Sequence, residues 1–150
     1  MKENNVILNV QESEALKLKN QLCFPLYAVS NKIIREYKPM LDELDLTYTQ
    51  YITMMVLWEK GDINEKILGE CLFLKSGTLT PLLKKLESKG FITKVRDKDD
   101  ERSIVISITE NGKKLKQKAK GVPKMMAERI NIQPDEAEFL YKILYKILED

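Results

Sequence analysis

The pattern of apolar and polar residues is clearest in the middle of the chain, where it predicts a helix followed by two strands. Between residues 76 and 89, four leucines recur at the spacing of one helical face: Leu79, Leu82, Leu83 and Leu86. Gly90 ends this helix, because glycine enters the left-handed conformation without a Cβ penalty. Two strand-like runs follow, residues 91–95 and 103–108, the second with alternating isoleucines.

Towards the N-terminus the pattern is helical from about residue 16 to residue 44, and two prolines interrupt it. Pro25 fits if it lies in the first turn of a helix that begins near Cys23. Pro39 disfavours helix at the residue before it, so we expect one helix from Cys23 to Tyr37 and a separate turn of helix through residue 44. Residues 1–11 are polar, and we expect them to be frayed.

Three further helices complete the pattern. Thr47 or Thr49 is a predicted N-cap for a helix that ends at Gly61 and buries one set of side chains: Tyr51, Ile52, Met55, Val56 and Trp58. Residues 64–72 form a shorter helix, with Ile67, Leu68 and Cys71 predicted to face inward. Ser76 is then predicted to cap the leucine-rich helix.

The C-terminal third is predicted to be helical again. Residues 113–126 are rich in lysine, and Gly121 with Pro123 should bend or break that helix. Pro134 lies in the first turn of a last helix with an apolar stripe. The apolar surface of the two ends exceeds what the small central unit can cover, which favours a self-complementary dimer. We expect one domain, with residues 14–48 and 113–150 as dimerisation helices around residues 49–108.

Composition narrows the function. The formal net charge of +2 is that of an ordinary globular protein, and no apolar run approaches a membrane span. The first 14 residues lack a secretory signal, so we expect a cytoplasmic protein. The sequence has no histidine and only two cysteines, Cys23 and Cys71, which disfavours hydrolytic and zinc chemistry. We therefore expect no metal, no cofactor and no enzymatic activity.

Helix, short helix, turn, helix and hairpin is the order of a winged helix-turn-helix: a mainly α fold with a small β-hairpin wing that reads DNA. We expect the leucine-rich helix to enter the major groove, with its hydroxyls near base edges and its lysines on phosphates. The residues expected to make these contacts are Lys75, Ser76, Thr78, Thr80, Lys84 and Lys85. Arg96 belongs to the same surface. Arg102, in the charged hairpin loop, can enter the minor groove, with Asp100 holding its guanidinium. The alternative to DNA binding is that the lysines are simply solvated and that Asp100 and Arg102 form an ordinary surface ion pair.

These residues resemble the MarR family of winged-helix repressors. The resemblance rests on the helix residues 76–84, on the Asp100–Arg102 pair, and on the run Ile108-Thr109-Glu110-Asn111-Gly112. It implies a homodimer that binds double-stranded DNA at a palindromic operator.

At the N-terminal helix the chain is similar to the branch of organic-hydroperoxide-sensing repressors. That resemblance implies that Cys23 is the peroxide-reactive thiol, that Tyr37 and Tyr48 of the other subunit hydrogen-bond it, and that Tyr27 lies nearby. Phenol donors favour a thiolate, and a thiolate attacks a peroxide to give a sulfenic acid. An apolar lining of Leu22, Phe24, Leu26 and Met40 would suit an organic hydroperoxide.

Two features of the cysteines shape the expected chemistry. Cys71 does not match the resolving cysteine of two-cysteine relatives and is predicted to be core, so the sulfenic acid would need an external low-molecular-weight thiol. Pro25 replaces a residue that is commonly small in the family. Three alternatives remain open: a regulator that answers a small aromatic or anionic ligand, a global thiol-based regulator of virulence or biofilm genes, and a thiol peroxidase.

Overall fold

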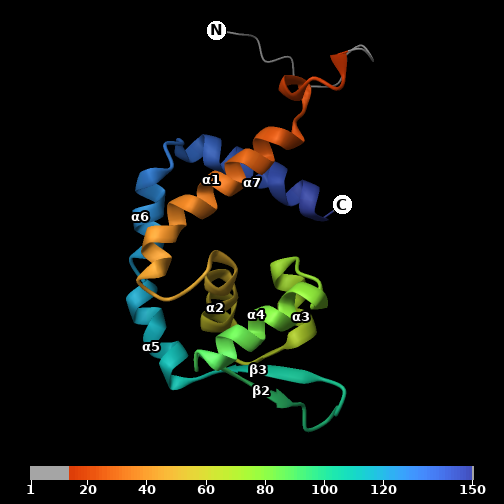
Figure 1. Cartoon of the computed structure of the whole chain (residues 1–150), viewed down its shortest axis with the longest axis vertical. Helices are drawn as coiled ribbons and strands as arrows, with labels where there is room; N and C mark the ends of the chain where they lie inside the picture. The colour runs from red at the N-terminus through yellow and green to blue at the C-terminus, as the bar shows by residue number, and fades with distance from the viewer. Residues whose placement is uncertain (1–13, 150) are drawn as a thin grey trace.

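The computed structural model describes residues 14–149 and is mainly helical with a three-stranded sheet. The expectation for residues 1–11 lies outside that range. A short 3-10 helix, η2 (Leu18–Asn20), precedes the main elements, which follow in the order α1 (Cys23–Asp42), α2 (Tyr48–Lys60), β1 (Ile63–Asn64), α3 (Glu65–Leu72), α4 (Ser76–Ser88), β2 (Ile92–Arg96), β3 (Ile104–Ile108), α5 (Glu110–Ala119), α6 (Val122–Arg129) and α7 (Pro134–Glu149). Figure 1 shows α1 and α7 at the opposite end of the molecule from β2 and β3.

The first helix differs from its prediction because it continues through Pro39. Pro25 lies in the first turn, as predicted, but α1 runs unbroken to Asp42. A proline inside a helix costs about 3 kcal/mol. Continuing the helix buries Met40 and Leu41, each worth about 1.5–3 kcal/mol when removed from water. This burial offsets the missing hydrogen bond, and the predicted break after Tyr37 is wrong.

The start of α2 is a capping box. The hydroxyl of Thr47 accepts from the backbone N–H of Gln50 at 3.3 Å, and Gln50 Oε1 accepts from the N–H of Thr47 at 3.1 Å. Thr47 is therefore the N-cap, one of the two predicted positions. The helix buries Gln50, Tyr51, Thr53, Met54 and Leu57, whereas Met55, predicted to be inside, is exposed.

The short helix α3 is rotated relative to its prediction. Leu68 and Gly69 are its buried residues, and Gly69 lies so close to α4 that an added Cβ would be 3.2 Å from Leu79. Ile67 and Cys71, which are one turn apart, share the exposed face. The prediction that Cys71 is core is therefore wrong, and both cysteines of the chain are exposed.

The leucine-rich helix is buried as its periodicity predicts. The four leucines of α4 have exposed fractions of 8% or less, and Gly90 has φ +75°. Ser76 is the first helical residue and Lys75 is the N-cap, so the predicted cap at Ser76 is wrong.

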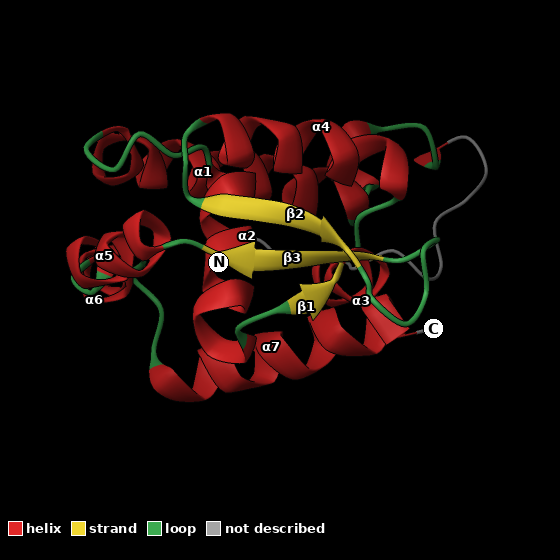
Figure 2. Cartoon of the chain, turned by 90° about the horizontal axis from the view of Figure 1, so that it is seen from below, coloured by secondary structure: helices red, strands yellow, loops and turns green. Residues whose placement is uncertain are grey.

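The wing is larger than the predicted hairpin because β1 adds a third strand. The order is β1-β3-β2, all antiparallel, with Ile63 opposite Ile106 and Ile92 opposite Ile108 (Figure 2). Ile106 is fully buried where the sheet meets the helices. The mainly α winged helix-turn-helix fold is confirmed.

Gly112 and Thr109 join the wing to the C-terminal helices. Thr109 caps α5 by accepting from the N–H of Gly112 at 3.1 Å, and its hydroxyl donates to the carbonyl of Gly90 at 2.6 Å. A Cβ on Gly112 would be 2.3 Å from the carbonyl oxygen of Phe91. The structure thus explains both ends of the Thr-x-x-Gly run: the threonine caps α5, and the glycine leaves room for the carbonyl of Phe91.

The terminal helices leave a large apolar surface. All the large apolar side chains of α7 are at least partly exposed, and so are most of those in the first half of α1. The lysine-rich segment is divided into α5 and α6 beside Gly121, as predicted. Across residues 14–149, no helix is both long and apolar enough to cross a membrane.

Candidate DNA interface and redox site

The exposed face of α4 carries most of the predicted DNA contacts. Burial of its leucines turns five predicted side chains towards solvent: Ser76, Thr78, Thr80, Lys84 and Lys85. Thr80 is partly engaged, because its hydroxyl donates to Glu65 Oε1 of α3 at 3.3 Å. The face therefore combines small hydroxyls in its first turns with lysines further along.

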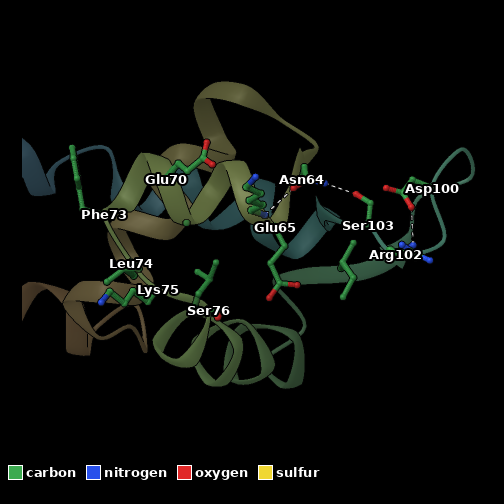
Figure 3. A pocket seen from close by; sticks show the side chains of 14 residues that line it. Asn64, Glu65, Glu70, Phe73, Leu74, Lys75, Ser76, Asp100, Arg102 and Ser103 are labelled. Atoms are coloured by element: carbon green, nitrogen blue, oxygen red, sulfur yellow. Dashed lines mark hydrogen bonds between the residues drawn. The ribbon is translucent and has the colours of Figure 1, made fainter. Parts of the chain in front are cut away.

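An open pocket of about 780 Å³ lies between α3, the start of α4 and the wing (Figure 3). It brings together Lys75, Ser76, Asp100 and Arg102, four of the predicted DNA-binding residues, which come from two parts of the chain, the start of α4 and the loop of the wing. A hydrogen bond between the side chains of Asn64 and Ser103 spans the same region. Two carboxylates, Glu65 and Glu70, also line the pocket, so its charge is mixed.

The tip of the wing is shaped by backbone hydrogen bonds. The carboxylate of Asp100 accepts from the backbone N–H of Arg102 at 3.0 Å. The sequence predicted a bond to the guanidinium of Arg102 instead. The N–H of Ser103 donates to the carbonyl of Asp100 at 2.8 Å, and that of Asp97 to the carbonyl of Ser103 at 2.9 Å. Asp100 thus orients the backbone at Arg102, and the side chain of Arg102 remains exposed. Arg96 is exposed at the end of β2.

Lys89, the C-cap residue of α4, contacts another part of the chain, whereas Lys84 and Lys85 are exposed on α4. The side chain of Lys89 is 26% exposed and contacts Asp45 and Gln50. These partners lie about forty residues earlier in the chain, and local periodicity gives no signal for such a contact.

Cys23 is exposed at the first residue of α1. The first turn of a helix has N–H groups without intrahelical partners and is the positive end of the helix dipole. Leu22, Phe24 and Leu26 around it are exposed, which makes the neighbourhood apolar as predicted. Met40 is different: it is buried about 25 Å further along the helix at 1.5 Å per residue, so it does not lie beside the cysteine of its own chain.

The tyrosines form two separate groups. Tyr27 lies one turn after Cys23 and is 67% exposed. Tyr37 lies in the second half of α1, with its ring centroid 5.0 Å from that of Tyr48 and 5.8 Å from that of Tyr51. Burial raises the pKa of Tyr37 and of Tyr48, so both phenols are protonated donors at neutral pH.

Helix geometry separates Tyr37 from the cysteine of its own chain. Tyr37 lies fourteen positions after Cys23 in α1, which corresponds to about 21 Å along the axis. A thiol and a phenol on one helix cannot cover that distance. Contact between these groups therefore requires a second copy of the chain.

Comparison with known proteins identifies the family. The model of the SarA/Rot transcriptional regulators matches residues 35–119. The chain is 46% identical over 134 residues to the organic hydroperoxide resistance transcriptional regulator of Bacillus subtilis, covering 89% of this chain and 91% of that one. It is 42% identical over 133 residues to the regulator SarZ of Staphylococcus haemolyticus, covering 89% and 90%.

The fold is also that of a protein solved on DNA. The structure of overoxidised AbfR bound to DNA superposes with a TM-score of 0.76 at 32% identity, covering 93% of this chain and 98% of that one. A family of regulators, not of enzymes, thus accounts for both the fold and the sequence. The chain belongs to the SarA/Rot family of transcriptional regulators, winged-helix proteins of the MarR type.

Proposed function

We propose that this chain is a DNA-binding transcriptional regulator whose operator affinity is controlled by oxidation of Cys23 by organic hydroperoxides. The observation that carries the proposal is the exposed Cys23 thiol, which lies at a helix N-terminus among exposed apolar side chains. The 46% identity to a regulator of organic hydroperoxide resistance supports the choice of oxidant.

The functional unit is a homodimer on a palindromic operator. The exposed apolar faces of α1 and α7 support dimerisation through residues 14–48 and 113–150. In a two-fold dimer, two copies of α4 about 34 Å apart meet successive major grooves. The hydroxyls and lysines of α4 contact bases and phosphates, and the wing places Arg102 and Arg96 along the flanking minor groove and backbone.

The reaction begins with the Cys23 thiolate. The sulfur attacks one oxygen of the hydroperoxide, the O–O bond breaks, and the leaving alkoxide takes a proton to become an alcohol. Two electrons leave the sulfur, which becomes a sulfenic acid. A low-molecular-weight thiol then displaces hydroxide from that sulfur, and a mixed disulfide and water form.

Tyr37 and Tyr48 of the second subunit act as hydrogen-bond donors to the thiolate. Hydrogen bonds to the charged form lower the pKa of a thiol and raise its thiolate fraction. Oxidation replaces the charged acceptor with a bulkier neutral group. The tyrosines then lose their acceptor, the segment between α1 and α2 moves, and the two winged units no longer match the operator spacing.

An operator-binding assay on reduced and peroxide-treated protein tests the proposal at one stated salt concentration. We expect cumene hydroperoxide to weaken binding by the wild type and dithiothreitol to restore it. Cys23→Ser should bind in both conditions. Cys71→Ser is the matched control, because Cys71 is also exposed yet lies in the winged unit.

Two results would contradict redox control through Cys23. Release of DNA by oxidised Cys23→Ser would move the sensor elsewhere in the chain. A wild type that ignores the peroxide but releases DNA on adding a small aromatic acid would be a ligand-controlled regulator instead.

A further inference from the structure

A lysine at the end of α4 is bound by the segment that joins α1 to α2. Lys89 Nζ donates to the backbone carbonyl of Asp45 and, at 3.2 Å, to Oε1 of Gln50. The carboxylate of Asp45 lies 3.3 Å from the same ammonium. The DNA-facing helix is thereby connected to residues 45–50.

The three contacts differ in strength. The side chain of Asp45 is 81% exposed, so its ion pair with Lys89 contributes little. Gln50 is only 2% exposed, and its Oε1 also accepts from the N–H of Thr47 to close the capping box of α2. The ammonium is therefore part of the N-terminal cap of α2, and it also stabilises the C-terminal end of the α4 dipole.

The same cap carries the tyrosine cluster. Tyr48 follows Thr47 as the first residue of α2, and its ring packs on Tyr37. Because one oxygen of Gln50 serves both Thr47 and Lys89, a displacement of Tyr48 that moves Gln50 changes both the capping box and the contact with Lys89. A movement of residues 45–50, here called the tyrosine segment, is thus transmitted directly to the end of α4.

Gly90, the residue after Lys89, attaches the end of α4 to the start of α5. The carbonyl of Gly90 accepts from the hydroxyl of Thr109, the N-cap of α5, at 2.6 Å. The C-terminal end of α4 is therefore held on one side by the segment after α1 and on the other by the start of α5. Any movement of the segment after α1 relative to α5 therefore acts on α4 at its C-terminal end.

We propose that Lys89 is the residue that couples the redox state of Cys23 to the orientation of α4, an inference that rests on the proposed function. Lys89 contacts neither DNA nor the thiol and acts as a positioning residue. In the reduced protein its ammonium fixes the end of α4 to the cap of α2. When the tyrosine segment moves on oxidation, this attachment carries the movement to the DNA-reading helix.

The test measures how strongly oxidation changes operator affinity, expressed as the ratio of the oxidised to the reduced Kd. Lys89→Met keeps the length and apolar stem of the side chain and removes the ammonium. Lys85→Met is the matched control, since it removes one charge from an exposed lysine one turn earlier on the same helix. We expect Lys89→Met to lower the ratio at least about fivefold, towards one, whereas Lys85→Met weakens both states alike and leaves the ratio unchanged.

Two additional measurements separate coupling from general damage. Dimedone should label the sulfenic acid of Cys23 equally in wild type and Lys89→Met, because the sensor itself is intact. Gln50→Met removes the shared acceptor while leaving Lys89 in place, so it should lower the ratio in the same way. This second variant also decides the question if Lys89→Met fails to fold.

Each outcome has a distinct meaning. A ratio for both Lys89→Met and Gln50→Met within about twofold of the wild type overturns the coupling role and leaves redox control standing. A wild-type ratio near one overturns redox control, and the coupling role falls with it. A lower ratio accompanied by weaker dimedone labelling would place Lys89 in the sensor and would also overturn the coupling role.

Discussion

The ring of Tyr37 packs against the ring of Tyr48 at a centroid distance of 5.0 Å, which joins the second half of α1 to the first turn of α2. Because of this contact, the two phenols that we assign to the redox site move as one unit. The helix that carries Tyr37 also carries Cys23, so in the proposed dimer a single helix supplies a thiol to one site and a phenol to another.

Removing the phenol donors should slow oxidation of Cys23. Tyr37→Phe and Tyr48→Phe keep both rings and delete the hydroxyls that would donate to the sulfur. We therefore expect the reaction with cumene hydroperoxide at pH 7 to slow by up to about tenfold, which corresponds to about 1.4 kcal/mol. Stopped-flow measurement of thiol loss gives the rate. Tyr51→Phe is the control, because the Tyr51 ring is buried in its own subunit and should leave the rate unchanged.

Alkaline pH should destabilise the fold through Tyr51. Burial, followed by the nearby phenols of Tyr37 and Tyr48, raises the pKa of Tyr51 to about 12. Between the unfolded pKa near 10 and this value the native state holds more protons than the unfolded state, so the free energy of unfolding falls as pH rises. Denaturant unfolding at a series of pH values measures this slope. Tyr51→Phe should be as stable as wild type at pH 7 and show a shallower fall above pH 10; an equal fall would remove Tyr51 from the explanation.

Gly112→Ala should strongly destabilise the protein. The added Cβ would meet the carbonyl oxygen of Phe91 at 2.3 Å, so α5 must move away from the wing at a cost of about 2–3 kcal/mol or more. Thermal unfolding should show a Tm lower by roughly 5 °C or more. Gly77→Ala is the opposite case: its Cβ meets nothing within 4 Å on the exposed face of α4, and we expect no loss of stability.

Arg102→Ala should reduce affinity most on operators with A·T-rich flanks. Asp100 fixes the backbone at Arg102 while the guanidinium remains exposed, which suits insertion into a narrow minor groove. Titrations of operators that differ only in their flanks measure the effect. Lys98→Ala removes an equal charge from the same loop. If both variants lose affinity equally on every flank, Arg102 contributes only general electrostatic attraction.

Strong periodic signals in the sequence identified much of the fold. The leucines of α4 and the glycine after it act within a few residues and were predicted correctly, and the threonine cap of α2 is one of the two positions predicted. The order of the elements predicted the winged unit, and the family resemblance led from the sequence to Cys23.

Features that depend on distant partners were missed. The two residues of β1 are too short for an alternating pattern, and they become a strand only by pairing with β3. The continuation of α1 through Pro39 depends on burial of Leu41, and the outward face of Cys71 depends on how α3 packs near Leu79. The link from Lys89 to Gln50 joins elements 39 residues apart, and sequence periodicity carries no information about it.

The 21 Å that α1 places between Cys23 and Tyr37 has a genetic consequence. If each site combines the thiol of one copy with the phenols of another, two defective alleles can repair each other. A cell that expresses Cys23→Ser together with a Tyr37→Phe, Tyr48→Phe chain would form mixed dimers with one complete site and one empty site. Oxidation at the wild-type rate would return in these mixed dimers, although neither allele provides it alone.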